Sequence, residues 1–285
     1  MIIHARVAEA RERLRLSGIA SNEADFDARL LAEHALGWDT ARFIAYGHEP
    51  EPPGFRDQYL ALIARRSDRE PVAYITGRQE FWGLSFEVSP AVLIPRPETE
   101  IIVEAALEAH PAGGPAFTFV DACTGSGCVA IAIAHDRPEA RGVATDISGA
   151  ALEVARRNAA RHGVEERVRL VEGDLLAPAD DVYDLIVSNP PYVRDGDRAS
   201  LPPEVRDREP ATALFAGPDG LDLVRRLVAE APAKLKPGGL LIFEFGFRQD
   251  QAVEELIRDS SALTMVAIRQ DLQRIPRTAI ARRTP

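Results

Sequence analysis

From residue 117 onward, short apolar runs alternate with stretches of helical periodicity, and this pattern restricts the possible folds most. The apolar runs are 117–122, 143–147, 168–171, 183–187, 240–245 and 263–269. Helical stretches at 129–134 and 150–161 separate the first of them. Strands that alternate with helices predict an α/β fold with a mostly parallel sheet and helices on both faces. In such sheets, ligands bind beyond the carboxyl ends of the strands.

The first 73 residues have a different pattern, because apolar residues recur at helical spacing from residue 3 to residue 63. We expect a small helical bundle with an apolar core, which helps to hold a partner. Asn22 is expected to cap the second helix and Asp39 the third, since both side chains can accept bonds from the first free N–H groups. Phe26 and Ile44 are expected to face the core of the bundle.

Residues 74–97 have the shorter period of a strand. Apolar and polar residues alternate from Leu84 to Val88, which predicts a strand with one buried face, and we expect a β-hairpin. Pro95 and Pro97 then favour extended geometry in the residue before each of them. Thr99 is expected to cap the helix that follows.

Composition and charge make several classes of protein less probable. The 285 residues suggest about two domains at roughly 150 residues each. The formal net charge is −10, which argues against a face that grips duplex nucleic acid by its phosphates. No apolar run approaches the roughly 18 residues of a membrane span, and no signal peptide is recognisable. Two cysteines suit a reducing compartment, so we expect a cytoplasmic protein without a membrane partner.

The first apolar run of the α/β region leads into a glycine-containing turn, Asp121-Ala-Cys-Thr-Gly-Ser-Gly127. Gly125 and Gly127 allow a tight turn and let a ligand approach the backbone. The segment lacks the third glycine of the dinucleotide fingerprint and the lysine of a P-loop. By itself it indicates a structural turn as readily as a ligand site.

Acidic residues follow the next two strands. Asp146 stands 25 positions after Asp121 and suits the two hydroxyls of a ribose, although a helix cap or a surface acid would also explain it. Asp174 can accept a hydrogen bond from an adenine amino group, and Leu175 can cover the ring. Together these strand ends describe a nucleoside site without a diphosphate cradle. Such a site fits S-adenosylmethionine better than NAD.

The most specific motif, Asn189-Pro-Pro-Tyr192, follows the fourth strand. The Asn189 side chain offers a carbonyl acceptor, and the Pro190 carbonyl is a second acceptor beside a residue that has no N–H. Two acceptors at this spacing can hold both hydrogens of a planar –NH₂ group, and Tyr192 can pack against that group. A proline-rich turn with a buried tyrosine is the structural alternative.

Taken together, these motifs resemble those of the PrmC/HemK family, the protein-(glutamine-N5) methyltransferases of peptide chain release factors. The resemblance covers nearly the whole chain. The matching segments are 70–77, 80–84, 92–100, 121–127, 189–193, 209–210, 217–221, 236–239 and 244–246. It implies a Rossmann-like class I methyltransferase sheet whose last strand is antiparallel, an N-terminal helical substrate-binding domain (1–73), a β-hairpin linker (74–97) and a methyltransferase domain (98–285).

The resemblance also implies a role for individual residues. The cofactor S-adenosylmethionine would contact Asp121, Cys123, Thr124, Gly125, Ser126, Gly127, Asp146, Asp174, Leu175 and Asn189. The substrate glutamine would contact Asn189, Pro190, Pro191 and Tyr192, with Asn189, Pro190 and Tyr192 as the catalytic group and no metal. Family members often have glycine where this chain has Cys123 and near Arg274. The partner would be a class I release factor, and we expect a monomer.

Other functions stay open at this stage. A glutamine methyltransferase acting on a ribosomal protein would share the same loop, as would a DNA amino-methyltransferase, which needs a flipped base and a target-recognition region. A non-catalytic binding module is a third alternative. The segments 95–100 and 195–210 either close over the site or form a connecting strand and a surface loop. Glu204, Asp207 and Glu209 are expected to be solvated, although they could attract a basic loop of a partner.

Overall fold

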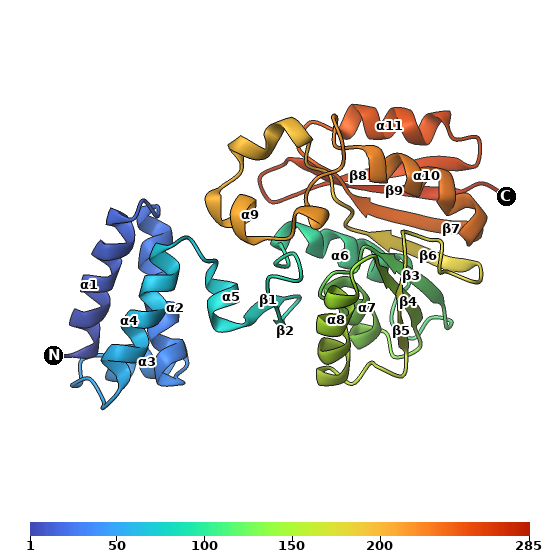
Figure 1. Ribbon diagram of the computed structural model, residues 1–285. Helices are drawn as coiled ribbons and strands as arrows, with labels where there is room; N and C mark the ends of the chain where they lie inside the picture. The colour runs from blue at the N-terminus through green and yellow to red at the C-terminus, as the bar shows by residue number, and fades with distance from the viewer. The chain divides into compact units, whose positions relative to one another are not determined.

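The computed structural model describes residues 1–285, which divide into two compact units (Figure 1). Unit 1 comprises residues 1–77 and 202–208, and unit 2 comprises residues 78–201 and 209–285. No helix in either unit combines the length and the apolar character that crossing a membrane requires.

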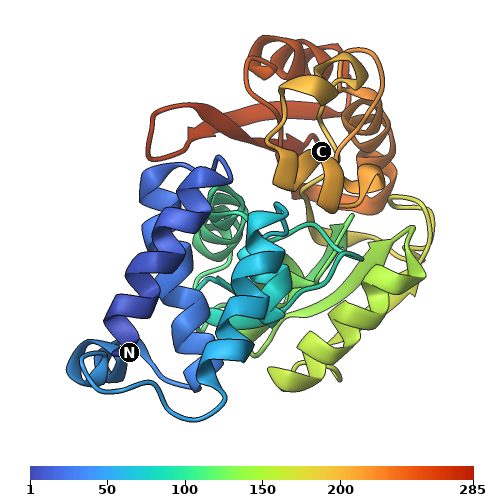
Figure 2. The ribbon, with the colours of Figure 1, turned by 60° about the vertical axis from the view of Figure 1, so that its left-hand side comes forward.

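Unit 1 is helical, as its periodicity predicts. Its helices are α1 (Ile3–Leu16), α2 (Ser21–Leu36), α3 (Thr40–Tyr46), α4 (Phe55–Ser67), α5 (Val72–Thr76) and the short α9 (Pro203–Arg208). Helices α1, α2 and α4 lie side by side in both views (Figure 1 and Figure 2). The Tyr59 hydroxyl in the core donates to the Ala28 carbonyl at 2.8 Å, so the buried phenol is satisfied.

The bundle departs from the local predictions in three places. Asn22 does not cap α2, because the helix already begins at Ser21 after Ala20. Phe26 is 53% exposed and Ile44 67% exposed, so neither belongs to the core. Asp27 instead takes the buried face of α2, where Arg66 of α4 donates to it at 2.6 Å. The prediction for Asp39 is confirmed, since its side chain accepts from the Arg42 N–H at 2.7 Å.

Unit 2 contains a seven-stranded sheet in the order β5-β4-β3-β6-β7-β9-β8. The strands are β3 (Thr118–Ala122), β4 (Arg141–Asp146), β5 (Val168–Glu172), β6 (Tyr183–Ser188), β7 (Leu235–Glu244), β8 (Leu263–Gln270) and β9 (Pro276–Arg283). β9, the last strand in the chain, pairs antiparallel with β7 and with β8, and all other strand pairs in this sheet are parallel, which confirms the sheet that the resemblance implied. Hydrophobic periodicity alone had not located this strand.

Helices cover both faces of the sheet. Residues of α6 (Glu100–Ala109) and α7 (Cys128–Asp136) share one apolar core with one face, and residues of α10 (Asp222–Lys234) and α11 (Asp250–Asp259) share another core with the opposite face. Helix α8 (Gly149–Arg161) connects β4 and β5 (Figure 1). With one layer of helices on each side, the strand ends are left as the open edge of the sheet.

The expected β-hairpin is present as β1 (Arg78–Phe81) and β2 (Leu84–Glu87), which pair antiparallel. Phe81 and Phe86 are buried in the same core as α6 and α7. At the turn of the hairpin, the Trp82 backbone N–H donates to the Glu100 carboxylate at 2.7 Å. The hairpin is therefore packed as part of unit 2.

Thr99 precedes α6, as predicted, but its side chain does not cap the helix. It ends a short 3₁₀ turn, Pro97–Thr99, and its backbone is already helical there. Its hydroxyl donates instead to the buried carboxylate of Glu244 at the end of β7, 2.7 Å away. A distant acceptor has thus replaced the local N–H groups as the partner of this side chain.

Candidate active site

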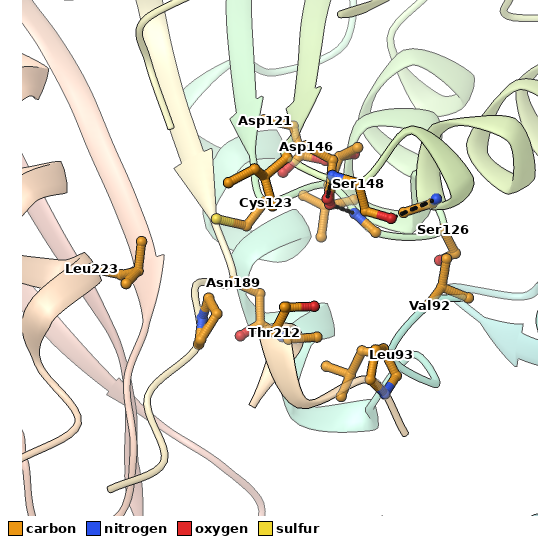
Figure 3. Close-up of a pocket in the computed structure, with 18 of the residues that line it drawn as sticks. Val92, Leu93, Asp121, Cys123, Ser126, Asp146, Ser148, Asn189, Thr212 and Leu223 are labelled. Carbon is orange, nitrogen blue, oxygen red and sulfur yellow. Dashed lines mark hydrogen bonds between the residues drawn. The ribbon is translucent and has the colours of Figure 1, made fainter. Parts of the chain in front are cut away.

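A cavity of about 350 Å³ opens at the carboxyl ends of β3, β4 and β6, which is the edge where an open α/β sheet binds ligands. Its volume lies within the range of small-molecule sites. Figure 3 shows Asp121 and Cys123 at the end of β3, Asp146 at the end of β4 and Asn189 directly after β6. The remaining wall is formed by residues from the segment before α6 and from the segment before α10: Val92, Leu93, Pro95, Thr99, Pro210, Thr212, Ala213 and Phe215.

The glycine-containing turn after β3 is built around Asp121. Its buried carboxylate accepts from the Thr124 hydroxyl at 2.6 Å and from the Ala130 N–H at 3.1 Å. Burial raises the pKa of Asp121 to about 7, although both hydrogen bonds favour the charged form. Asp121 thus ties the turn to the first residues of α7.

The two glycines of this turn share a left-handed backbone but differ in the space around them. Both have a positive φ, +55° at Gly125 and +81° at Gly127. A Cβ on Gly125 would meet no atom within 4 Å, whereas a Cβ on Gly127 would lie 2.9 Å from Ile131 Cδ1. Gly127 therefore leaves room for the Ile131 side chain of α7 and for Ala155 of α8, and it does not line the cavity. Gly125 leaves its backbone accessible from the cavity.

Ser126 and Asp146 provide the polar groups of this wall. The Ser126 side chain is almost fully buried, yet its Oγ has no hydrogen-bond partner in the protein. Asp146 accepts from the Gly125 N–H at 2.8 Å and from the Ser148 N–H at 2.9 Å, and burial raises its pKa. Each carboxylate oxygen keeps a further acceptor position for a ligand hydroxyl. Ser148, not Asp146, caps α8 through the Ala151 N–H.

Asp174 and Leu175 line the next part of the cavity. Asp174 is half-exposed and accepts from the Arg226 guanidinium at 2.9 Å, so one of its oxygens is already occupied. Leu175 is buried, and its backbone has a φ of +47°.

Ile147 also lines the cavity and is 65% exposed, but the sequence pattern did not lead us to predict it. A large apolar residue directly after the strand-end acid Asp146 was the available signal.

These walls fit a nucleoside that carries a charged amino-acid tail. Acidic groups lie at the ends of β4 and β5, and apolar side chains lie beside them. The Ser126 hydroxyl has no hydrogen-bond partner in the protein, so it can bind a polar group of a ligand. A buried hydroxyl without a partner costs about 1–3 kcal/mol, which a ligand that hydrogen-bonds to it would recover. S-adenosylmethionine has polar groups of the required kinds.

The Asn189–Tyr192 loop follows β6 and is held from behind. The Asn189 Nδ2 donates to the Thr99 Oγ1 at 3.0 Å, and the Tyr192 hydroxyl donates to the Glu244 Oε1 at 2.9 Å. Glu244 is 1% exposed, and its burial raises its pKa. The neighbouring negative charge of Glu244 raises the pKa of Tyr192, so this phenol stays protonated. Asn189 and Pro191 line the cavity, whereas Pro190 and Tyr192 do not.

Backbone contacts fix the same loop. The Tyr192 carbonyl accepts from the Gln249 Nε2 at 3.0 Å, and Gln249 also accepts from the Gly246 N–H at 2.7 Å. Gly220 lies so close that a Cβ on it would be 2.2 Å from the same carbonyl oxygen. The loop is therefore held through both its side chains and its main chain.

The acidic residues of the 195–210 segment were expected to be solvated, and this is wrong for two of them. Glu204 accepts from Arg66 at 3.0 Å and from Arg69 at 2.8 Å within unit 1. Glu209 is buried in unit 2, where it pairs with Arg96 and accepts from the Ile94 N–H at 3.2 Å. Arginines of the same chain thus already neutralise these two carboxylates.

The two departures from the family pattern have one structural explanation. Cys123 has a φ of +60° and Arg274 a φ of +62°. Glycine adopts this left-handed conformation without strain, whereas for other residues it raises the conformational free energy by about 1–2 kcal/mol. Both positions therefore have the backbone of a glycine and the side chain of another residue.

Comparison with known proteins gives consistent matches over both parts of the chain. The family model described as the PrmC N-terminal domain matches residues 7–77, and the one described as the methyltransferase small domain matches residues 99–201. A release factor glutamine methyltransferase of Cereibacter sphaeroides is 43% identical over 268 residues, 94% of each chain. Another, of Caulobacter vibrioides, is 40% identical over 280 residues, 97% of this chain and 94% of the relative.

Solved structures agree on the fold. A methyltransferase from Pyrococcus furiosus superposes with a TM-score of 0.54 at 20% identity, over 78% of this chain and 98% of the other. At that identity the likeness concerns the fold alone. The family follows from the sequence matches, which extend over nearly the full length of both partners. The chain belongs to the family of release factor glutamine methyltransferases.

Proposed function

We propose that this protein transfers a methyl group from S-adenosylmethionine to the side-chain amide nitrogen (N5) of the glutamine in the Gly-Gly-Gln motif of class I peptide chain release factors. The names of its relatives support the substrate. The observation that carries the chemistry is the position of Asn189. It lines a cavity suited to a nucleoside, and its Nδ2 is bound to Thr99, so that its carbonyl oxygen is free for a ligand amide.

Asp146 would hold the ribose hydroxyls, Asp174 and Leu175 would contact the adenine, and the 121–127 turn with Ser126 would hold the methionine part. When bound, S-adenosylmethionine supplies a methyl group activated on a sulfonium, and S-adenosylhomocysteine is the product. Cys123, Thr124 and Gly125 complete this wall. The protein's own task is then to orient the nitrogen that receives the methyl group.

A glutamine amide nitrogen is a poor nucleophile because its lone pair is delocalised. The Asn189 Oδ1, which lines the cavity, would accept one of its N–H groups, and the Pro190 carbonyl, although Pro190 is outside the cavity lining, stays the predicted acceptor of the other. Together they would aim the nitrogen, which lowers the entropic part of the barrier. Positive charge develops on this nitrogen during transfer, so both acceptors bind the transition state more strongly than the ground state. The proton then leaves to solvent.

The domains and partners stay part of the proposal. Residues 1–73 would bind the release factor, 74–97 would link them to the catalytic part, and 98–285 would carry the methyl transfer. The protein would act as a monomer in the cytoplasm, without membrane or duplex nucleic acid. The relatives' names favour a release factor over a ribosomal protein or DNA.

One incubation tests the substrate. Purified protein and S-adenosylmethionine are offered a release factor, ribosomal proteins or DNA, and mass spectrometry locates the added methyl group. We expect it on the glutamine of the Gly-Gly-Gln motif. The variant Asn189→Ala should transfer at least about 10²-fold more slowly, as when one transition-state hydrogen bond is removed from an active site. A methyl group on ribosomal protein or DNA alone would overturn the proposed substrate.

A further inference from the structure

A buried carboxylate lies behind the catalytic loop, at the carboxyl end of β7. Glu244 is 1% exposed, and each of its oxygens accepts one hydroxyl: Oε2 from Thr99 at 2.7 Å and Oε1 from Tyr192 at 2.9 Å. Thr99 in turn lies 3.0 Å from the Asn189 Nδ2. A chain of hydrogen bonds therefore joins the interior carboxylate to the side chain that faces the cavity.

The direction of these bonds is fixed by chemistry. Because each Glu244 oxygen faces a hydroxyl donor, the contacts favour the ionised carboxylate, which can only accept, so the single proton of the Thr99 hydroxyl points to Glu244. The Thr99 oxygen then has only lone pairs on the side that faces Asn189. It can accept from the NH₂ end of the Asn189 amide but cannot donate to its carbonyl end.

We propose that Glu244 and Thr99 are positioning residues, which set the Asn189 amide so that its carbonyl, and not its NH₂, faces the substrate. This inference deepens the proposed function and rests on it. An asparagine side chain has nearly the same shape after a 180° rotation of its amide, so packing alone selects neither orientation. The rotated form would present donors to the donors of a glutamine amide.

The same orientation determines which substrate side chain is accepted. A carbonyl oxygen that faces the substrate attracts the NH₂ group of glutamine and repels the carboxylate of glutamate. A rotated Asn189 would accept glutamate more readily, because its NH₂ could donate to that carboxylate. Sites that bind through buried polar groups reject a mismatched analogue by large factors, so loss of the orientation should reduce this discrimination.

The test uses Thr99→Val, which keeps the shape of the side chain and removes its hydroxyl, with Thr99→Ser as the rescue. The control is Thr278→Val. Thr278 is paired with Glu244 across β7 and β9, is equally buried, and its hydroxyl has no hydrogen-bond partner. Turnover is measured with a release factor, and inhibition with the release factor whose motif glutamine is replaced by glutamate.

We expect Thr99→Val to lower kcat by about 10–100-fold, the usual effect of losing a group that orients a functional side chain. The preference for glutamine over glutamate should fall at least 10-fold, and Thr99→Ser should restore both. Thr278→Val should match the wild type. Glu244→Gln provides a second variant. Its side-chain amide can donate to the Thr99 oxygen, so the Thr99 proton is no longer forced to point away from Asn189. This variant should show the same loss of preference for glutamine.

A measurement that needs no substrate separates this inference from the proposed function. In ¹⁵N-labelled protein, the Asn189 side-chain NH₂ should exchange its protons at least 10-fold faster in Thr99→Val than in the wild type. An unchanged exchange rate, or an unchanged preference for glutamine, would overturn the positioning role. A wild-type protein that methylates no release factor would overturn the proposed function, while the exchange rates would still decide the positioning role.

Discussion

Replacing Gly220 by alanine should disable the catalytic loop while leaving the cofactor pocket intact. Gly220 has a φ of +74°, and an added Cβ would lie 2.2 Å from the Tyr192 carbonyl oxygen and 2.8 Å from the Gln249 Nε2. The Tyr192 carbonyl belongs to the backbone of the catalytic loop, and the Gln249 Nε2 donates the hydrogen bond that holds this carbonyl. The added methyl group therefore strikes both parts of one contact.

The size of the effect follows from these distances. Real Cβ contacts essentially never fall below 3.0 Å, so the Tyr192 backbone must retreat by about 0.8 Å. A misplacement of about 1 Å in a positioned reacting group costs about 10²-fold in rate. The left-handed backbone adds about 1–2 kcal/mol of strain, and overpacking adds about 1–3 kcal/mol. A fold with a stability of about 5–15 kcal/mol should survive this loss.

Methyl transfer to a release factor gives kcat, and calorimetry gives the dissociation constant of S-adenosylmethionine. We expect kcat to fall by about 10²-fold, while the dissociation constant changes less than about threefold, because the 121–127 turn is untouched. Gly163→Ala is the matched control. Gly163 has a φ of +64° and no atom within 4 Å of its added Cβ, so it carries the backbone strain without the collision.

Two outcomes would contradict this reasoning. If Gly220→Ala retained the turnover of Gly163→Ala, the placement of the Tyr192 carbonyl would not matter to catalysis. If both variants lost turnover to the same extent, the loss would come from general destabilisation.

Three further substitutions test other parts of unit 2. Arg274→Gly should raise the free energy of unfolding by about 0.5–1 kcal/mol in denaturant titration, because it relieves a left-handed arginine, whereas Arg274→Ala should not. Burial raises the pKa of Asp121 to about 7, so the folded protein holds a proton that the unfolded chain releases above about pH 4. The free energy of unfolding of the wild type, relative to Asp121→Asn, should therefore fall by up to about 1.4 kcal/mol per pH unit between pH 4 and 7; a flat or rising difference would contradict the raised pKa. Ser126→Ala should weaken S-adenosylmethionine about fivefold in calorimetry without destabilising the free protein, since its hydroxyl has no protein partner to lose.

The sequence was sufficient where the determining interactions are short-ranged or repetitive. Apolar runs of strand length located six of the seven strands, because a buried strand needs a continuous apolar stretch. The ligand edge followed, since parallel strands end together. Strand β9 was not located from its pattern: its buried stretch Thr278–Ala281 is short, and arginines stand on both sides of it.

The misplaced predictions have a common physical origin in partners that are distant along the chain. Phe26 was expected inside because local periodicity cannot show that Arg66, 39 positions after Asp27, draws Asp27 into the buried face. Thr99 was expected to cap its own helix, yet a carboxylate 145 positions away binds its hydroxyl. A charged or buried acceptor forms a stronger hydrogen bond than an exposed helix end, so the long-range partner prevails.

The same long-range pairing explains why unrelated short motifs occur together in this chain. Glu100 binds the Trp82 backbone, Glu209 binds Arg96, Glu244 binds Thr99 and Tyr192, and Gly220 makes room for the Tyr192 carbonyl. Several motifs without chemistry of their own thus support the hairpin, the cavity wall or the loop after β6. Removing one member leaves the other buried and unpaired, which costs more than removing both. The effects of such paired substitutions should therefore be non-additive, with the double variant less impaired than the sum of the single ones.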